Sequence, residues 1–205
     1  AFSKALNDVL DNNLNEEEHG WITKIEDQRR HYLSTNKVIE VLDFGAGKAD
    51  SNRTEEAMYG GISTEVSVNN ICLASKPYFW ALLLFKLVRH FKPKLCVELG
   101  TCLGISASYQ SAALTLNSFG KLITIEGSPS LSKISAQTFS DLGLEKVDVL
   151  TGRFEDQLHQ VLTNNEVVDF VFIDGHHDKD ATIHYFERFL PFLKSDAVIV
   201  FDDIN

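Results

Sequence analysis

The sequence contains no apolar stretch long enough to cross a membrane. Its longest apolar run, residues 78–88, is interrupted by Lys86 and is much shorter than the roughly 20 residues that a bilayer-spanning helix needs. The first residues also lack a basic segment followed by an apolar one, so nothing at this start resembles a secretory signal. We therefore expect a cytoplasmic protein without a membrane partner.

Cysteine is scarce, and the three thiols do not form a metal-binding pattern. Cys72, Cys96 and Cys102 lack the short paired spacings of a zinc site. Cys96 also lies inside an apolar run that is typical of a strand. We interpret all three as buried thiols of a protein in a reducing compartment, which excludes a small fold held by disulfides.

Basic residues are outnumbered by acidic ones. The 19 Lys and Arg residues against 29 Asp and Glu give a formal net charge of −10. Such a charge repels polyphosphates, so we expect small-molecule ligands and no nucleic acid partner. We interpret the glutamate run at residues 16–18 as solvated. With 205 residues, 44% of them apolar, the chain is large enough to bury the core of a globular domain.

The sequence after Pro93 alternates between two patterns. Short β-branched or apolar runs, mostly apolar on both faces, are typical of strands buried in a parallel sheet. Between them, apolar residues recur at helical spacing. The alternation predicts an α/β fold over residues 93–205, with a Rossmann-like, doubly wound and mostly parallel sheet. The predicted strands cover residues 94–99, 121–126, 147–151, 168–174 and 197–202.

The first 92 residues show no such alternation, and we interpret them as an N-terminal helical cap and lid region over the sheet. The pattern predicts a helix over residues 17–34, a strand over 38–44 and a polar loop over 48–70. A strongly apolar helix is predicted from Pro77, because proline is well tolerated in the first turn of a helix.

Two segments place an acidic residue and glycines after an apolar run, namely residues 41–47 and residues 97–104. In both, a turn between strand and helix could bring bare backbone close to a ligand. A ribose-binding carboxylate should then stand at the end of the next strand, about 20 to 30 residues on. Glu126 meets this test for the second loop, whereas no comparable strand is predicted after the first. We therefore assign the ligand to residues 97–104 and interpret the first loop as a structural turn or part of a lid.

An ordered set of motifs resembles class I S-adenosylmethionine-dependent methyltransferases. The set consists of the spacing Glu98-x-Gly100-x-x-x-Gly104, the strand-terminal Glu126 and the later Asp174. The sequence is most similar to the small-molecule O-methyltransferase branch, which includes the catechol and caffeoyl-CoA enzymes, and to related uncharacterised bacterial methyltransferases.

The resemblance implies that S-adenosylmethionine is the cofactor. Gly100 and Gly104 would line its methionine end, with Glu98 near the ammonium group and Ser106 near the carboxylate. Glu126 would hold both ribose hydroxyls, since one ionised carboxylate can accept two adjacent hydrogen bonds. The complete implied set is Glu98, Gly100, Thr101, Gly104, Ser106, Glu126, Gly127 and Asp174.

Methyl transfer to an oxygen is an in-line displacement that needs positioning and an activated nucleophile. The candidate catalytic residues Asp174, His177 and Lys179 follow the fourth predicted strand, at the edge of the sheet where ligands bind. His177 is our first choice for the general base, because imidazole accepts a proton near neutral pH. Lys179 is the alternative base, and His177 could instead only form hydrogen bonds within a surface loop.

The resemblance also raises the question of a metal ion. In the metal-dependent relatives, an Asp after the fourth strand and an Asp-Asn pair after the fifth bind a magnesium-like cation. Asp174, Asp202 and Asp203 stand at those positions, with Asp-Asp in place of Asp-Asn. Three carboxylates suit a hard divalent cation and repel one another without one. Alternatively, Asp174 orients the adenosine while Asp202 and Asp203 cap the next helix.

The function implied by the resemblance is methyl transfer to a small-molecule acceptor, at oxygen. One alternative is a non-catalytic cofactor-binding or scaffold protein. The other, a nicotinamide-dependent oxidoreductase, is disfavoured because Gly100 and Gly104 are too far apart for a Gly-x-Gly-x-x-Gly loop. The related enzymes have seven strands, whereas this sequence stops at Asn205, after the fifth. We expect the C-terminal strands to lie beyond Asn205; alternatively, a homodimer covers the exposed sheet edge.

Overall fold

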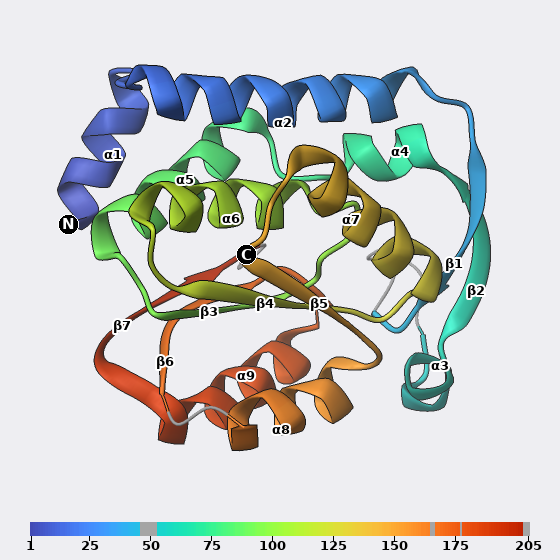
Figure 1. Cartoon of the computed structure of the whole chain (residues 1–205). Coiled ribbons are helices and arrows are strands. Elements are labelled where there is room, and N and C mark those ends of the chain that lie inside the picture. The colour runs from blue at the N-terminus through green and yellow to red at the C-terminus, as the bar shows by residue number, and fades with distance from the viewer. Residues whose placement is uncertain (46–52, 165–166, 177, 203–205) are drawn as a thin grey trace.

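The computed structural model describes residues 1–45, 53–164, 167–176 and 178–202 and is built around a five-stranded sheet (Figure 1). The strand order is β5-β4-β3-β6-β7, and every neighbouring pair in this sheet is parallel. The predicted Rossmann-like α/β fold is therefore confirmed. The strands are β3 (Leu95–Leu99), β4 (Lys121–Glu126), β5 (Val147–Thr151), β6 (Val168–Ile173) and β7 (Leu193–Phe201).

Helices cover both faces of the sheet. On one face lie α5 (Tyr78–Phe91), α6 (Ile105–Asn117) and α7 (Pro129–Leu142), and on the other lie α8 (Phe154–Asn164) and α9 (Lys179–Phe189), as Figure 1 shows. A short 3₁₀ turn, Leu190–Phe192, connects α9 to β7. All five residues of β3 are buried, which fits a strand enclosed between two helical layers.

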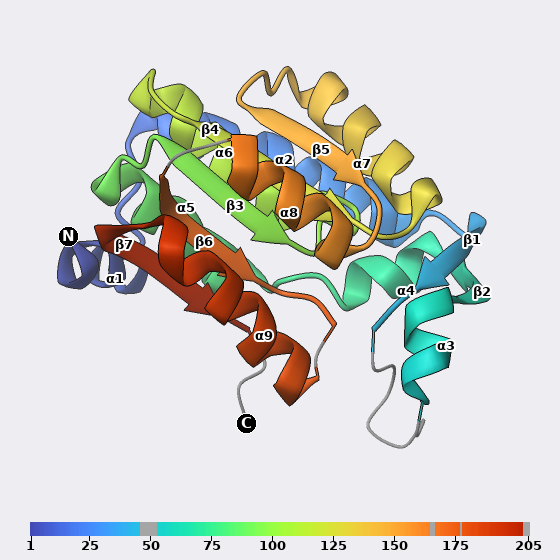
Figure 2. The ribbon, with the colours of Figure 1, turned by 90° about the horizontal axis from the view of Figure 1, so that it is seen from below.

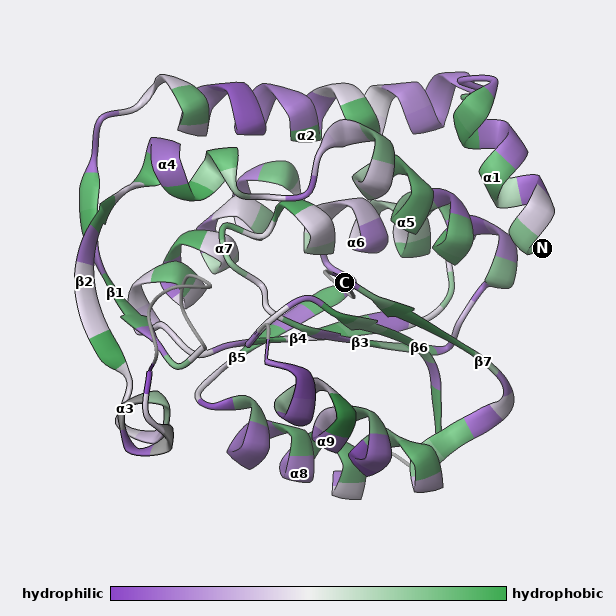
Figure 3. Cartoon of the chain, turned by 180° about the vertical axis from the view of Figure 1, so that it is seen from behind, coloured by the Kyte–Doolittle hydropathy of each residue, from purple (hydrophilic) through white to green (hydrophobic). Residues whose placement is uncertain are grey.

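Two hydrophobic cores result from this arrangement. In β3, Leu95, Val97 and Leu99 belong to the core between the sheet and the helices α8 and α9. Cys96, which points to the opposite face, belongs to the core that includes α5 and α6. Successive side chains of a strand point to opposite faces, so a strand inside such a sheet is apolar throughout. Figure 3 shows the strands as mostly apolar and the helices as mixed along their length.

The order of the strands creates a switch point beside β3. From β3 the chain adds β4 and then β5 on one side, and after α8 it returns to place β6 on the other side of β3 (Figure 2). Crossover connections from adjacent strands leave in opposite directions at such a point and open a crevice at the carboxyl ends of the strands. In this chain the crevice lies at the carboxyl ends of β3 and β6.

The N-terminal region shares a core with the sheet. Residues of α1 (Phe2–Leu10), α2 (Glu16–Ser34) and α4 (Val68–Leu73) pack into the same hydrophobic cluster as α5 and α6. In Figure 1, α2 lies as an outer layer above α5 and α6. Among the described residues, no helix combines the length and the hydropathy that a membrane crossing requires.

The prediction of a polar loop over residues 48–70 is wrong for its described part. This part contains α3 (Glu55–Gly60), β2 (Ile62–Ser67) and the first residues of α4. β2 pairs antiparallel with β1 (Val38–Asp43) in a separate two-stranded sheet. The middle of β2 is exposed and polar, so it lacks the apolar run on which strand prediction depends. For the same reason the polar start of β7 was missed, and that strand begins at Leu193 rather than at residue 197.

Glu18 is buried, so interpreting the whole glutamate run as solvated was wrong. Its carboxylate accepts hydrogen bonds from Nζ of Lys86 at 2.7 Å and from Nε of Arg89 at 3.0 Å. It also closes the capping box of α2 with Asn15, in which each residue's side chain accepts from the other's backbone N–H. Burial alone would raise the pKa of Glu18, but the hydrogen bonds from Lys86 and Arg89 hold it below its ordinary value. This ion pair fastens α2 to α5.

Replacing Glu18 by Gln should therefore destabilise the protein. The change leaves Lys86, which is 3% exposed, without its closest counter-charge, and breaking such a buried pair lowers the free energy of unfolding by about 3 kcal/mol. Urea denaturation measures the effect, with Glu17→Gln on the exposed side of the same helix turn as the control. Equal unfolding free energies for the two variants would contradict this role for Glu18.

Candidate functional site

A cavity of about 500 Å³ opens at the switch point of the sheet. Its wall includes Gly100 after β3, Glu126 at the end of β4 with Gly127 after it, and Asp174 after β6. Ligand crevices of doubly wound sheets lie at this edge, and the volume is in the range of small-molecule sites. The cavity is therefore the candidate binding site.

Gly100 makes the floor of this cavity possible. Its backbone has φ +102°, and a Cβ atom built there would lie 2.0 Å from the carbonyl oxygen of Asp174. Only glycine avoids both the strained backbone and the collision. The close approach continues the β3–β6 ladder beyond its last pair, since the N–H of Asp174 donates to the carbonyl of Leu99 at 2.9 Å.

Glu126 presents a carboxylate held by backbone groups. Oε2 accepts from the N–H of Cys102 at 2.8 Å, and Oε1 accepts from the N–H of Ser128 at 2.8 Å. Burial, together with the nearby Asp43, raises the pKa of Glu126 to about 7 despite these bonds. Each carboxylate oxygen can accept more than one hydrogen bond. The side chain is thus fixed in orientation and retains capacity for a ligand.

The eight predicted cofactor residues divide into two groups. Gly100, Glu126, Gly127 and Asp174 line the cavity. The other four, Glu98, Thr101, Gly104 and Ser106, are not among the residues that line it. Thr101 hydrogen-bonds Thr124 through their hydroxyls at 2.6 Å. Gly104 is the N-cap of α6, and a Cβ there would meet the ring of Phe139 at 2.8 Å.

Glu98 lies within the protein rather than at the cavity wall. It is fully buried and accepts from Thr124 Oγ1 at 2.6 Å and from Gln110 Nε2 at 2.8 Å. Burial raises its pKa to about 7, although hydrogen bonds from Thr124, Ser106 and Gln110 act in the opposite direction. Near neutral pH this carboxyl group therefore exchanges between its ionised and its protonated form.

The first glycine loop reaches the same cavity as the second. Asp43, Phe44 and Gly45 line it together with Gly100 and Glu126. The two loops are therefore neighbours rather than alternatives. β1 positions the first loop against α7, because the N–H of Leu42 donates to Ser128 Oγ at 3.2 Å.

The first loop also closes part of the cavity wall. A Cβ on Gly127 would lie 2.7 Å from the ring of Phe44, so the lack of a side chain at 127 is what admits this ring. Asp43 accepts from the N–H of Gly45 at 2.8 Å and from Arg53 at 2.7 Å. These bonds hold the turn over the cavity.

Asp174 and Asp202 both contact the same lysine. Lys76 Nζ is 3.3 Å from Oδ1 of Asp174 and also forms an ion pair with Asp202. Burial raises the pKa of Asp174 to about 8, with Lys76 acting in the opposite direction. Asp203, the third predicted metal ligand, lies outside the described residues. Within the described part of the chain, no group of three or more His, Cys, Asp or Glu side chains is arranged to hold a metal ion.

Neither of the two predicted general bases is found in the cavity lining of the described structure. His177 lies outside the described residues. Lys179 is exposed, begins α9 and is not part of the cavity lining. The neighbouring His176 does line the cavity, with its backbone at φ +70°.

Three further residues of this region were not singled out from the sequence. Arg153 and Phe154 line the cavity just after β5, and their place at the end of a predicted strand was the signal that could have found them. Arg153 stacks on Tyr59, with 4.0 Å between the guanidinium carbon and the ring centre. Lys76 gave no such signal, because it lies before α5, far in the sequence from the aspartates that it contacts.

The free energy of unfolding should fall with rising pH, partly because of Glu98. Replacing Glu98 by Gln should make this fall smaller. A carboxyl pKa raised from 4.5 to about 7 means that the native state binds the proton more tightly than the unfolded state. Stability therefore falls between about pH 4.5 and 7, by roughly 3 kcal/mol at most for this shift. The Gln side chain can also donate to Oε1 of Gln110, which is buried without a hydrogen-bond partner among the described residues.

Unfolding free energies at pH 5 and pH 8 measure this effect. Glu98→Gln should be more favourable relative to wild type at pH 8 than at pH 5, whereas the exposed control Glu65→Gln should follow wild type at both. If Glu98→Gln retained the full wild-type difference between the two pH values, the raised pKa would not belong to Glu98.

Comparisons with known proteins agree with this geometry. The structure is similar to the O-methyltransferase of Bacillus cereus in complex with SAH, with 29% identity and a TM-score of 0.59 over 65% of this chain and 60% of that one. It is also similar to the O-methyltransferase TomG of Streptomyces achromogenes, solved with SAM and involved in tomaymycin synthesis. For TomG the identity is 28% and the TM-score 0.57, over 62% of this chain and 56% of that one.

A third structure shares the fold at lower identity. The SAH-bound methyltransferase PaMTH1 of Podospora anserina is 22% identical, with a TM-score of 0.58 over 64% of this chain and 55% of that one. The present chain thus spans less than two thirds of the length of each of these relatives. The search of curated proteins returned no match.

A family model supplies the remaining comparison. It describes a methyltransferase domain and matches residues 97–204, which include Gly100, Glu126 and Asp174 of the cavity lining. The match covers more than half of the chain and begins within β3. On this basis the chain belongs to the methyltransferase-domain family.

Proposed function

We propose that this protein is an S-adenosylmethionine-dependent methyltransferase that acts at an oxygen atom of a small-molecule acceptor. Two of its structural relatives are O-methyltransferases solved with SAH or SAM. The cavity at the switch point is the proposed cofactor site. Bound there, the cofactor supplies an activated methyl group on a sulfonium, and the protein contributes orientation and electrostatics.

The position of Glu126 is the observation that carries this proposal. The carboxylate ends β4, lines the cavity and is held by the N–H groups of Cys102 and Ser128. A ribose offers two adjacent hydroxyl donors, and an ionised carboxylate of fixed orientation accepts both through charge-assisted bonds. We assign this role to Glu126, with Phe44 and Gly127 bounding the same part of the cavity.

Charged side chains of both signs line the cavity. Asp43, Glu126 and Asp174 lie in its wall together with Arg53 and Arg153. S-adenosylmethionine carries a sulfonium, an ammonium and a carboxylate group, so its cationic and its anionic groups can each face side chains of opposite sign.

We propose that the acceptor binds between the cofactor and residues 1–92, which act as its cap. The first turn of α5 exposes the aromatic side chains of Tyr78, Phe79 and Trp80, which follow Lys76 after the single residue Pro77. Aromatic side chains in this place suit a flat organic acceptor. His177 stays the proposed general base for the acceptor hydroxyl.

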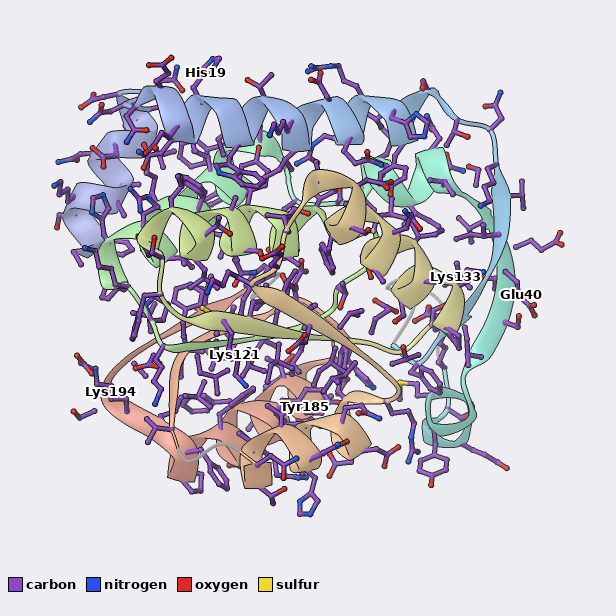
Figure 4. All side chains as sticks on the ribbon, viewed as in Figure 1. His19, Glu40, Lys121, Lys133, Tyr185 and Lys194 are labelled. Carbon is purple, nitrogen blue, oxygen red and sulfur yellow. The ribbon has the colours of Figure 1, made fainter. Side chains whose placement is uncertain are left out.

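Replacing Glu126 by Gln tests the cofactor assignment. The amide removes the negative charge that strengthens hydrogen bonds to a diol, so the affinity for S-adenosylhomocysteine should fall by roughly tenfold to a hundredfold. Isothermal titration calorimetry measures it. The control is Glu40→Gln on β1, where Glu40 points away from the protein (Figure 4).

The pH dependence of the affinity for S-adenosylhomocysteine gives a second test of the role of Glu126. Because the pKa of Glu126 is raised to about 7, the carboxylate gains its charge between about pH 6 and 8, and wild-type affinity should rise over that interval. In Glu126→Gln the rise should be smaller, because Asp174, with a pKa of about 8, then still gains charge at the cavity wall in this interval. Unchanged affinity in Glu126→Gln at pH 8 would remove the basis of the proposed function.

A further inference from the structure

Lys76 lies where the chain places two aspartates from neighbouring strands. Asp174 follows β6 and Asp202 follows β7, at the carboxyl edge of the sheet. The ammonium of Lys76 contacts both carboxylates. All three side chains are largely buried, with exposed fractions of 13% for Lys76, 15% for Asp174 and 21% for Asp202. One ammonium thus already pairs with both carboxyl groups.

The backbone around Lys76 is held in place by contacts of its neighbours. Ser75 Oγ donates to the carbonyl of Cys72 at 2.6 Å and accepts from Arg29 Nη1 at 2.9 Å. On the other side Pro77 is the N-cap of α5, and its carbonyl accepts from the N–H of Ala81 at 3.0 Å. Lys76 therefore extends from an ordered segment, and its position is a property of the fold.

The site does not suit a divalent cation as the described residues stand. An ion bound by Asp174 and Asp202 would have to occupy the space of the Lys76 ammonium, and close approach of the two cations is strongly unfavourable at a buried site. An ammonium carries three N–H donors and pairs with carboxylates without needing a coordination shell of six oxygens. One lysine therefore satisfies two aspartates that otherwise repel each other.

We propose that Lys76 takes the place of a divalent metal ion at this site, so that the protein itself supplies the cation that pairs with the carboxyl groups of Asp174 and Asp202. On the proposed function, methyl transfer then needs no added metal. Lys76 is in this account a positioning residue that fixes both aspartates beside the cofactor cavity.

Manganese binding tests this proposal without any methyl transfer. Electron paramagnetic resonance follows the loss of free Mn²⁺ signal as wild type, Lys76→Met and Asp174→Asn are titrated. Wild type and Asp174→Asn should bind Mn²⁺ equally weakly. Lys76→Met should gain a stoichiometric site, because the two carboxyl groups then face the space that the ammonium has left. Adding Asp174→Asn to Lys76→Met should abolish the gain.

The matched control is Lys194→Met at the start of β7. Lys194 also lies between two aspartates, 3.7 Å from Asp169 and 3.1 Å from Asp196, but at the surface and at the other end of the strand (Figure 4). This variant should bind Mn²⁺ like wild type. If Lys76→Met does not fold, the Mn²⁺ titration of wild type and Asp174→Asn tests the proposal alone: equally weak binding supports it, and a stoichiometric wild-type site that Asp174→Asn removes contradicts it.

Two outcomes would overturn the proposal. One is a stoichiometric Mn²⁺ site in wild type that Asp174→Asn removes, and the other is a folded Lys76→Met that gains no Mn²⁺. Neither depends on S-adenosylmethionine, so the proposed function is tested separately. Conversely, failure to bind S-adenosylhomocysteine would refute the proposed function and leave the manganese result standing.

Discussion

The contact between Gly100 and the carbonyl oxygen of Asp174 determines how this site is built. It joins the turn after β3 to the turn after β6, the two strands that flank the switch point. No side chain can be added at residue 100 without separating these turns, because a Cβ would lie 2.0 Å from that oxygen. The close contact between these two turns therefore forms part of the cavity wall and positions the side chain of Asp174.

Around that contact the fold concentrates buried carboxyl groups. Glu98 and Glu126 have pKa values of about 7 and Asp174 of about 8, in each case mainly because burial disfavours the charged form. Such charges reduce the stability of the folded chain at neutral pH and are commonly retained at functional sites. Their local partners differ: backbone N–H groups bind Glu126, polar side chains surround Glu98, and a lysine contacts Asp174.

Much of the sheet domain could be predicted from the sequence, because strands buried on both faces leave continuous apolar runs. β4 and β5 have the predicted bounds. Glu126 could be predicted because it stands at the end of a recognisable apolar strand. Its distance in sequence from residues 97–104 is also the distance that one βαβ unit produces. β2 and the start of β7 could not be predicted in this way, because their residues are exposed and polar and their pairing depends on distant strands.

The shared cavity of the two loops and the ion pairs of Lys76 depend on tertiary packing. Leu42 contacts Ser128, and Lys76 contacts Asp202, across separations that no local pattern records. Glu98 shows the opposite difficulty, since its motif was recognised but its side chain binds Gln110 on α6 and is not part of the cavity lining. A motif in a sequence indicates a strand end and a turn, whereas the direction of each side chain depends on the neighbouring layer.

The most direct test of the account is a crystal structure with S-adenosylhomocysteine. We expect the ribose hydroxyls to lie within hydrogen-bond distance of Glu126, with the amino-acid end of the ligand over Gly100 and beside Asp174. A ligand bound elsewhere on the chain, or a ribose that does not contact Glu126, would contradict it.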